Sequence, residues 1–304
     1  MEENFRFVFE RDNNEIIMEK SLKISILVAN YNNGCYLQQA IDSVFIQHYK
    51  HWEIIIVDDN STDNSIEVYD KYKDDEHFHI YYNYENRGVG YTKRSCLEQA
   101  NGEICGFLDP DDVLFGEDVF DVMVETHLNH PNASMVYSGM YRADEKLNIL
   151  RESPGKTIES GKSALDTMDW PYHPFLTFKM EKYKMTEGMD ATMRRAVDYD
   201  LYYKLEEVGE VVHLDCIQYI QRNNPRSISL NDNAYKAAAW HTYACVQAMK
   251  RRGLMDESLM LFPFEHKLKE YYLKGYKKAT SSRIYKTGKL VAAPLLLLQK
   301  LWKK

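Results

Sequence analysis

The chain has 304 residues, of which 44% are hydrophobic and 28% charged, and its formal net charge is -8. This length is enough to bury a large core, and the composition is that of a soluble globular protein. The negative charge argues against nucleic acid as a partner, because phosphate binding requires clustered positive charge. The five cysteines are scattered without the paired spacing of a zinc site, so we expect a reduced, cytoplasmic setting.

The first part of the chain alternates between strand and helix patterns. Residues 1–22 are polar and charged, lack the apolar run of a signal peptide, and are expected to form an extension before the first strand. A β-branched apolar run at 23–29 predicts a buried strand, and the helical spacing after it predicts a helix to about Gln47. A second buried strand is expected at 52–57, after which 61–63 can cap a helix.

The alternation continues toward the middle of the chain. Further strands are predicted at 78–82, 104–108 and 135–141, with helices at 90–100 and 117–129. Because each parallel crossover needs a helix to return the chain, this order predicts the α/β fold class with a largely parallel, layered sheet. Later the pattern loosens, although helices are predicted at 197–208 and 234–252, and further helical stretches to about residue 278.

Polar residues follow three of the predicted strands. Tyr31 follows the first strand, Asp58 and Asp59 end the second, and 109–112 follow the strand at 104–108. Ligands of such sheets bind beyond the carboxyl ends of the strands. We therefore expect these segments to converge on one site.

The sequence Asp109-Pro110-Asp111-Asp112 is the densest acidic cluster among these segments. Carboxylates this close repel one another, so a cation or many donors must compensate. Hard oxygen ligands suit Mg²⁺ or Mn²⁺, which typically also hold substrate phosphates. The alternative is a solvated acidic turn whose geometry Pro110 sets in advance.

Four motifs in order carry a resemblance to a known family. They are Val28–Asn32, Val57–Asp63, Asn86–Lys93 and Phe107–Asp112. Together they resemble the inverting family 2 glycosyltransferases with the GT-A fold, and the match runs from Ile24 to about Ser229. The resemblance implies a nucleotide-sugar-binding fold with a mostly parallel central sheet flanked by helices, and a helical C-terminal extension.

The expected domain organisation follows from that resemblance. Residues 1–22 are the N-terminal extension, and 23–230 form the glycosyltransferase domain. Within it, 23–115 are the nucleotide-binding half and 116–230 the acceptor-binding half. Residues 231–304 form a helical region that ends in a basic and apolar tail.

The resemblance assigns roles in the nucleotide-sugar site. Asp58 is similar to the carboxylate that accepts from the N3–H of a uracil ring, and Tyr31 lies against the base, as aromatic faces do. Ala29, Lys93 and Asp109 complete this site, with Asp109 at the ribose or near the metal. The alternatives are a turn or capping role for Asp58, a packed aromatic at Tyr31, and a solvated lysine at Lys93.

The resemblance also implies a divalent cation, Mn²⁺ or Mg²⁺. Asp111 is the first choice as its direct ligand, and Asp112 is the close competitor. Asn224 stands where the family often carries histidine, and its carbonyl oxygen is a doubtful third ligand. Arg222 or Arg226 is expected to neutralise the diphosphate, although an ordinary surface loop is an equal alternative.

Inverting transfer needs a base for the acceptor hydroxyl. The segment 187–201 resembles the family segment that ends in Glu-Asp before a helix, and Asp198 falls on the catalytic carboxylate, with Val197 in place of glutamate. Asp198 is also placed to cap the helix, and Asp200 is its nearest rival. His173 either faces the acceptor or packs within an aromatic patch.

The C-terminal tail reverses the charge of the chain. Residues 279–304 carry basic side chains without acids, around an apolar run at 290–298 that is too short to span a bilayer and is broken by Pro294. This pattern suits an interfacial segment on anionic lipid at the inner face of the membrane. The alternative is a helix that packs on the core or on a second subunit.

The expected function is an inverting, metal-dependent glycosyltransferase of cell-surface polysaccharide synthesis. It would move a sugar from a nucleotide diphosphate-sugar, UDP-linked, to a hydroxyl of a glycan or lipid-linked acceptor. A sugar nucleotidyltransferase is disfavoured because 29–36 lack a glycine-rich loop, and a dehydrogenase because 87–90 lack the third glycine of its fingerprint. A non-catalytic nucleotide-sugar or glycan-binding protein is the other alternative, whereas a processive synthase would carry transmembrane helices and a Gln-x-x-Arg-Trp motif.

Overall fold

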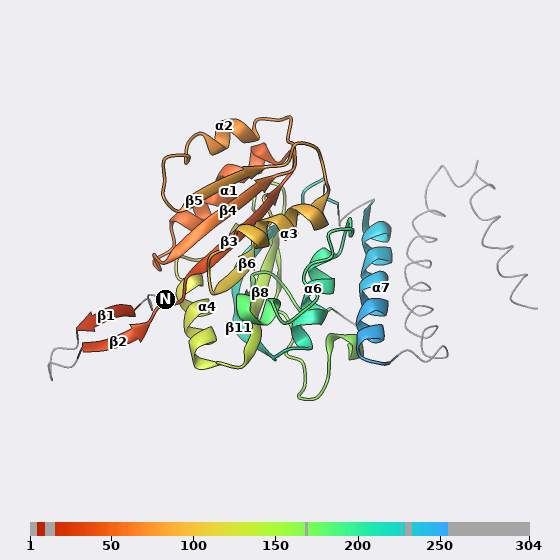
Figure 1. Cartoon of the computed structure of the whole chain (residues 1–304). Coiled ribbons are helices and arrows are strands. Elements are labelled where there is room, and N and C mark those ends of the chain that lie inside the picture. Colours follow the sequence, from red (N-terminus) through yellow and green to blue (C-terminus); the bar gives the residue numbers. More distant parts are fainter. Residues whose placement is uncertain (1–4, 10–15, 168–169, 226, 229–232, 255–304) are drawn as a thin grey trace, which may run out of the picture. The chain divides into compact units, whose positions relative to one another are not determined.

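A computed structural model describes residues 5–9, 16–167, 170–225, 227–228 and 233–254 of the chain (Figure 1). The contacts divide the chain into a compact unit, Met1–Ala248, and a second unit, Met249–Lys304. All elements below lie in the first unit, except the last turn of the final helix. The expected helical stretches to residue 278 and the tail at 279–304 lie outside the described residues.

The first unit is built on a mixed sheet that has nine strands in the described part of the chain. In spatial order its strands are β5 (Phe78–Tyr82), β4 (Trp52–Asp58), β3 (Ile24–Asn30), β6 (Ile104–Phe107), β10 (Leu176–Lys179), β8 (Ala133–Ala143), β11 (Glu210–Arg222) and β7 (Val113–Leu114), with β9 (Ile149–Ser153) on β8. The helices are α1 (Gly34–Phe45), α2 (Ser65–Tyr69), α3 (Val89–Gln99), α4 (Val119–Asn129), α5 (Met180–Tyr183), α6 (Val197–Glu206) and α7 (Ala234–Arg251), with a 3₁₀ turn at Ala164–Asp166.

One half of the sheet is parallel, as expected. β5, β4, β3 and β6 pair in parallel along their shared edges. The other half is mixed, because β10 runs antiparallel to both β6 and β8. β10 is reached through the segment at 154–175, which holds only a 3₁₀ turn and no crossover α-helix among its described residues. The α/β fold class is confirmed.

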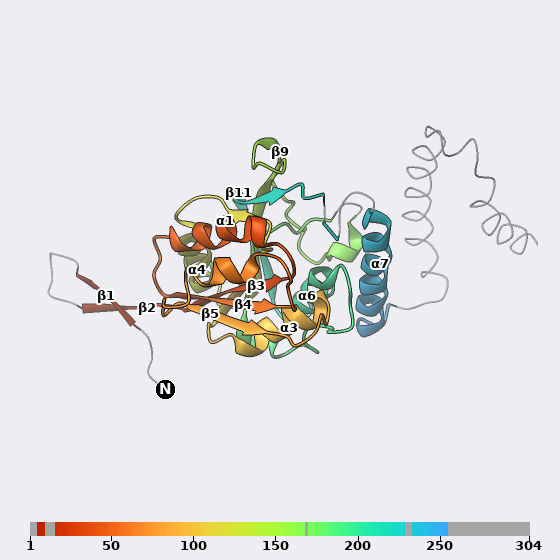
Figure 2. The ribbon, with the colours of Figure 1, turned by 90° about the horizontal axis from the view of Figure 1, so that it is seen from above.

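The central strands form because their sequences are continuous apolar runs, which suit strands covered on both faces. Every residue of β4 is buried, and so is every residue of β3 except Ala29. One cluster packs α1, α2 and α4 against one face of the sheet, and a second packs α3, α6 and α7 against the other (Figure 2). The sheet is therefore the middle of three layers.

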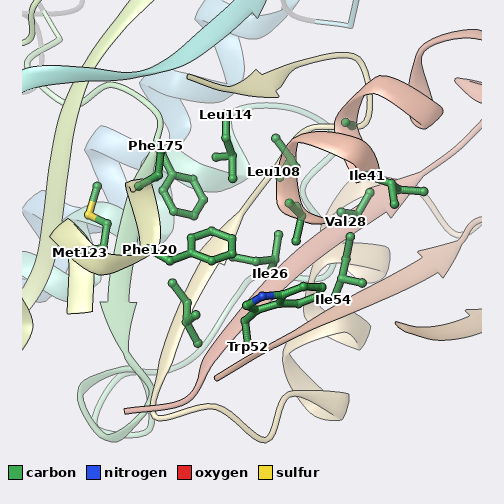
Figure 3. Packing of buried hydrophobic residues seen from close by; sticks show 14 of the residues in the cluster. Ile26, Val28, Ile41, Trp52, Ile54, Leu108, Leu114, Phe120, Met123 and Phe175 are labelled. Atoms are coloured by element: carbon green, nitrogen blue, oxygen red, sulfur yellow. The ribbon is translucent and has the colours of Figure 1, made fainter. Parts of the chain in front are cut away.

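The first cluster shows how distant segments meet in the core. Figure 3 shows Ile26 of β3 beside Phe120 of α4, with Ile54 of β4 on the side toward Ile41 of α1 and Phe175 beyond Phe120. The rings of Phe120 and Phe175 lie 6.4 Å apart between centroids. This packing joins the parallel half of the sheet to the mixed half.

Several elements were not expected from the sequence. β1 (Phe5–Phe9) and β2 (Ile16–Lys20) form an antiparallel hairpin within the expected extension. β7, β9, β10 and β11 are also new, and the helix expected after 61–63 ends at Tyr69. No helix among the described residues is long and apolar enough to cross a membrane.

Candidate active site

Three parallel strands end side by side, and polar residues follow each of them. β3 pairs with β4 up to Asn30 and Asp58, and with β6 on its other edge. Tyr31 therefore follows the middle strand, Asp59 follows β4, and Asp109 follows β6. The expected convergence of these segments at the carboxyl edge of the sheet is confirmed.

Asp58 is buried at this edge, where its carboxylate binds protein donors. Oδ1 accepts from the backbone N–H of Ser61 at 2.7 Å. Oδ2 accepts from the Tyr69 hydroxyl at 2.6 Å and from the Asn30 amide at 3.2 Å. These bonds hold the turn after β4, and a contact of Asp58 with a uracil ring stays a prediction.

Tyr31 lies in a more open position than Asp58. It exposes 46% of its surface at the end of β3, and Ala29, two residues earlier, is half-buried. An exposed ring at this edge is able to stack on a planar base. The binding roles predicted for Tyr31 and Ala29 remain predictions.

Asp59 organises the loop before α3, a role that the sequence analysis did not assign. Its Oδ1 accepts from the Asn83 amide and from the backbone N–H of Arg87, both at 2.8 Å. Its Oδ2 accepts from the backbone N–H of Gly88 at 2.8 Å, and Gly88 has a φ of 86°, in the region that favours glycine. Two successive carboxylates at a strand end, Asp58 and Asp59, were the signal available in the sequence.

Lys93 of α3 connects two carboxylates from other segments, Asp109 after β6 and Asp198 in α6. Its Nζ lies 3.1 Å from Asp109 Oδ1 and 2.7 Å from Asp198 Oδ1, and 4.8 Å from the centroid of the Phe107 ring. Burial lowers the pKa of Lys93, but the two carboxylates more than offset this effect, and the net pKa is raised. The lysine is therefore a permanent cation between two carboxylates, and the alternative of a solvated lysine does not hold because its side chain is only 6% exposed. Its role in nucleotide-sugar binding stays a prediction.

Asp198 lies in the first turn of α6, and its side chain is 30% exposed. The helix is capped by Ala196, which has a φ of 54° and makes no side-chain cap bond. Burial raises the pKa of Asp198, Lys93 lowers it and Asp109 raises it again, with a net upward shift. Its carboxylate is thus held by Lys93 and is more basic than that of an ordinary aspartate, a combination that suits the acceptance of a proton.

Asp200, the rival of Asp198, points to a different partner. Its Oδ2 accepts from Lys204 Nζ at 2.6 Å, and both side chains are buried. Lys204 also donates to the backbone carbonyl of Gly188 at 2.8 Å. This pair fastens α6 to the preceding loop and does not share the cation of Asp198.

The loop before α6 is fastened to the start of α3. The backbone N–H of Gly90 donates to the carbonyl of Met193 at 3.2 Å, and Arg194 Nη1 donates to the carbonyl of Arg87 at 2.7 Å. A Cβ on Gly90 would lie 2.5 Å from the Met193 oxygen and 2.7 Å from the Asp190 oxygen. Only glycine permits this approach, which places Lys93 opposite Asp198.

The aspartate turn, which consists of residues 109–112, holds its carboxylates in different surroundings. Asp112 is buried, with Oδ2 accepting from the Tyr219 hydroxyl at 2.9 Å and Oδ1 from the backbone N–H of Arg222 at 2.8 Å. Asp111 Oδ2 lies 2.8 Å from the side-chain nitrogen of Asn224. Burial and the neighbouring aspartates raise the pKa of both Asp111 and Asp112. Asp109 is more open than the buried Asp112, with 44% of its side chain exposed.

Arg222 stabilises this turn from behind. Its Nε donates to the carbonyl of Asp111 at 2.6 Å, its Nη1 to the carbonyl of Glu145 at 2.5 Å, and its Nη2 to Gln39 Oε1 at 2.7 Å. The guanidinium is buried and also lies 4.7 Å from the centroid of the Tyr36 ring. With its donors engaged in this way, Arg222 is poorly placed to neutralise a diphosphate, and Arg226 lies outside the described residues.

The donor set at Asp111 and Asn224 fits a hard divalent cation. The two ends of a carboxamide have the same shape, so a rotated Asn224 would present its oxygen beside the Asp111 carboxylate. Burial and then the negative charge of Asp109 raise the pKa of Asp111, and a divalent cation there would offset both effects. Within the described residues, no cluster of three or more histidine, cysteine or acidic side chains has metal-binding geometry.

His173 packs inside the second half of the unit. Its Nε2 lies 3.0 Å from the Ser153 hydroxyl, and burial, followed by the charge of Arg142, lowers its pKa to about 4. The ring is therefore neutral at physiological pH. A contact of His173 with the acceptor stays a prediction.

Comparisons with known proteins find related sequences and similar folds. Chondroitin synthase from Escherichia coli is 26% identical over 196 residues, which cover 64% of this chain and 28% of the relative. The chain thus spans about a quarter of that relative. S. aureus TarS in complex with UDP-GlcNAc superposes with a TM-score of 0.64 at 16% identity, over 87% of this chain and 77% of that one.

A second solved structure has the same architecture. The mannosyltransferase PcManGT from Pyrobaculum calidifontis, in complex with GDP-Man and Mn²⁺, superposes with a TM-score of 0.57 at 16% identity, over 92% of this chain and 80% of that one. At these identities the likeness concerns the fold, which is the GT-A fold expected from the sequence motifs. The family model "Glycosyl transferase family 2" matches residues 25–183, more than half of the chain, and the chain therefore belongs to that family.

Proposed function

We propose that this protein transfers a sugar, with inversion, from a nucleotide diphosphate-sugar to a hydroxyl of a glycan or lipid-linked acceptor. The observation that carries the proposal is the shared cation: Lys93 binds Asp109 at the carboxyl edge of the sheet and Asp198 in the first turn of α6. Asp109 belongs to the expected donor site, and Asp198 is the expected base. Lys93 thus holds a residue of the expected donor site next to the expected base.

Asp198 is proposed to remove the acceptor proton. Its Oδ1 accepts from Lys93, so Oδ2 is the oxygen that takes the proton as the acceptor oxygen attacks the anomeric carbon. Burial raises the pKa of this carboxyl, which makes it a stronger base than an exposed aspartate, while Lys93 keeps it ionised. Attack opposite the leaving diphosphate inverts the configuration of that carbon.

The charge of the leaving diphosphate needs a counterpart, and Asp111 with Asn224 would hold Mn²⁺ or Mg²⁺ for this purpose. When bound, such a cation stabilises the negative charge that develops on the diphosphate. Asp112 would support the turn from its buried position between Tyr219 and Arg222. The Mn²⁺ named with PcManGT supports this assignment by analogy of fold.

The donor is proposed to be UDP-linked, with Tyr31 against the base and Asp58 at its imide. S. aureus TarS is described with UDP-GlcNAc, which supports a uridine donor, whereas PcManGT is described with GDP-Man. A role in polysaccharide synthesis is supported by the chondroitin synthase relative. The domain division at 22 and 230, and the peripheral location through 279–304, are further proposals that rest on the sequence.

A direct test is the release of nucleoside diphosphate by the full chain from a panel of UDP- and GDP-sugars, with Mn²⁺ and with EDTA. We expect slow hydrolysis of a UDP-sugar that requires the metal and rises when the matching acceptor is added. Calorimetric titration with UDP, with and without Mn²⁺, measures donor binding separately. Absence of both binding and hydrolysis for every nucleotide would contradict the proposal and favour a protein that lost the nucleotide site.

A further inference from the structure

One aromatic side chain on α6 has a hydroxyl that no other described residue binds. This residue is Tyr202. The hydroxyl of its neighbour Tyr203 forms a hydrogen bond with Cys245, and the hydroxyl of Tyr172 donates to Glu206. The hydroxyl of Tyr202 makes no hydrogen bond within the part of the chain that the structure describes. The oxygen of this hydroxyl is not fully enclosed by protein. Part of the 9% exposure of Tyr202 therefore belongs to the hydroxyl.

The ring of Tyr202 is fixed by other rings. Trp170 lies 6.4 Å away between centroids with planes 20° apart, and Tyr172 lies 6.1 Å away at 88°. Tyr172 is itself anchored by its bond to Glu206. Such offset and edge-to-face contacts restrict the ring, so the direction of the Tyr202 hydroxyl is set in advance.

That direction is toward the candidate base. Tyr202 follows Asp198 by four residues on α6, which places both on one face of the helix. Long side chains in helices point back toward the N-terminus, so the Tyr202 ring lies over the turn that carries Asp198. After burial, the carboxylates of Asp198 and then Asp109 are the groups that raise the pKa of Tyr202. The phenol therefore remains a hydrogen-bond donor at physiological pH.

The hydroxyl of Tyr202 forms no hydrogen bond with either carboxylate in the described part of the chain, and Lys93 binds only the Oδ1 atom of each. Because side chains four residues apart on a helix are neighbours, a group that contacts Asp198 Oδ2 would also lie within reach of the Tyr202 hydroxyl. A neutral hydroxyl fits this position, whereas an anionic acceptor such as a phosphate would be repelled by the carboxylates. A sugar ring offers such hydroxyls in adjacent positions.

We propose that Tyr202 binds the acceptor: its hydroxyl donates a hydrogen bond to an oxygen of a sugar ring next to the hydroxyl that Asp198 deprotonates. This assignment rests on the proposed function and deepens it, because it makes the group that is glycosylated a carbohydrate. Tyr202 stands one helical turn after Asp198 on α6, so its ring is a neighbour of the proposed base. Trp170 packs along the same ring and holds it in place.

The test compares Tyr202→Phe with Tyr203→Phe, which makes the same chemical change one residue away, where the hydroxyl faces Cys245 and His241. The probes are p-nitrophenyl α- and β-hexosides as acceptors, with the UDP-sugar that the wild type hydrolyses. For Tyr202→Phe we expect the KM of the acceptor to rise about tenfold, corresponding to about 1.4 kcal/mol. Calorimetric affinity for UDP with Mn²⁺ and the rate of donor hydrolysis stay at wild-type values, and Tyr203→Phe keeps the wild-type acceptor KM.

The outcomes separate this inference from the proposed function. An unchanged acceptor KM in Tyr202→Phe, or a loss that falls on UDP affinity alone, overturns the role in acceptor binding. If the wild type binds UDP and hydrolyses the donor but neither glycosylates nor binds any hexoside, as followed by saturation-transfer NMR, the carbohydrate acceptor is wrong. If the wild type does not bind UDP at all, the proposed function itself fails.

Discussion

Lys93 and Asp198 form an ion pair with Nζ 2.7 Å from Oδ1, although 105 positions separate them in the chain. The lysine comes from the middle of α3 and the aspartate from the first turn of α6. The loop before α6 is fastened to α3 through Gly90 and Met193, so this pair is held by backbone contacts as well as by charge. The arrangement makes the protonation of Asp198 depend on Lys93 and Asp109, which come from distant segments of the chain.

Removal of the proposed base is the first prediction. Asp198→Asn keeps the shape of the side chain but cannot take a proton, so we expect the rate of transfer to fall by about 10²–10⁴-fold. UDP affinity with Mn²⁺ is expected to change little, because the substitution lies on α6. The exposed Asp215 offers the matched control, Asp215→Asn, which should transfer at the wild-type rate. Transfer by Asp198→Asn at more than about a tenth of that rate would exclude Asp198 as the base.

The pH dependence of kcat gives a second prediction. Because Asp198 acts ionised, kcat rises as pH increases through its pKa, and burial places this rise above the range of an ordinary aspartate. In Lys93→Met the favourable charge is lost, so the rise moves to higher pH. In Asp109→Asn a repelling charge is lost, so it moves to lower pH.

The measurement is kcat at saturating donor between pH 4 and about pH 9, where the position of the rise is independent of its height. Shifts in the same direction for both substitutions would show that charge at Asp198 does not control the profile.

The aspartate turn allows a third prediction, on the metal. Asp111 is the carboxylate beside Asn224, whereas both oxygens of Asp112 accept from protein donors. We therefore expect Asp111→Asn to raise the Mn²⁺ concentration for half-maximal activity by more than about a hundredfold, and Asp112→Asn by about tenfold. Donor hydrolysis titrated with Mn²⁺ after EDTA treatment measures both values, and the opposite ranking would make Asp112 the ligand.

A fourth prediction concerns the support of this turn. Arg222→Met removes a buried charged donor from the carbonyls of Asp111 and Glu145, and should lower the free energy of unfolding by about 3 kcal/mol. Arg94→Met is the control, because the Arg94–Glu98 pair is exposed and should contribute less than about 1 kcal/mol. Urea denaturation of both variants checks the difference. Equal losses would mean that the Arg222 contacts do not stabilise the turn.

The buried pair on α6 supports a fifth prediction. Lys204→Met leaves the charge of Asp200 buried opposite an apolar side chain, and should cost about 3–5 kcal/mol. The double variant Asp200→Leu with Lys204→Met removes both charges and should recover most of this loss. Thermal unfolding of the single and double variants is the measurement, and a double variant less stable than the single one would contradict the argument.

The sequence was most informative where strands are covered on both faces. β3, β4 and β6 are continuous apolar runs, and their ends placed Tyr31, Asp58 and Asp109 at one edge. β11 was missed because most of its residues are only partly buried, so neither an apolar run nor a regular alternation marks it. β7 and β10 are too short to show a period.

The candidate site was predictable in its residue types but less so in its contacts. The acidic motifs identified Asp111 and Asp198, whereas the ion pair of Lys93 depends on the approach of α6 to α3, which no local pattern encodes. Arg222 was one of two arginines expected at the diphosphate. Its burial behind the aspartate turn is a tertiary feature, which the sequence alone does not show. Tyr202 was missed for a related reason, since an aromatic residue on a buried helix face usually belongs to the core.

Gly90 has no functional group, yet it sets the spacing between the two halves of the site. An alanine there would need about 1 Å of separation between α3 and the 190–193 loop, because its Cβ would otherwise lie 2.5 Å from a carbonyl oxygen. A misplacement of that size can cost about a hundredfold in rate without removing any reacting group. If the protein has the proposed activity, its rate depends on the backbone fit at Gly90 as much as on the carboxylates, and a slower variant at Gly90 would report a change in geometry and not in chemistry.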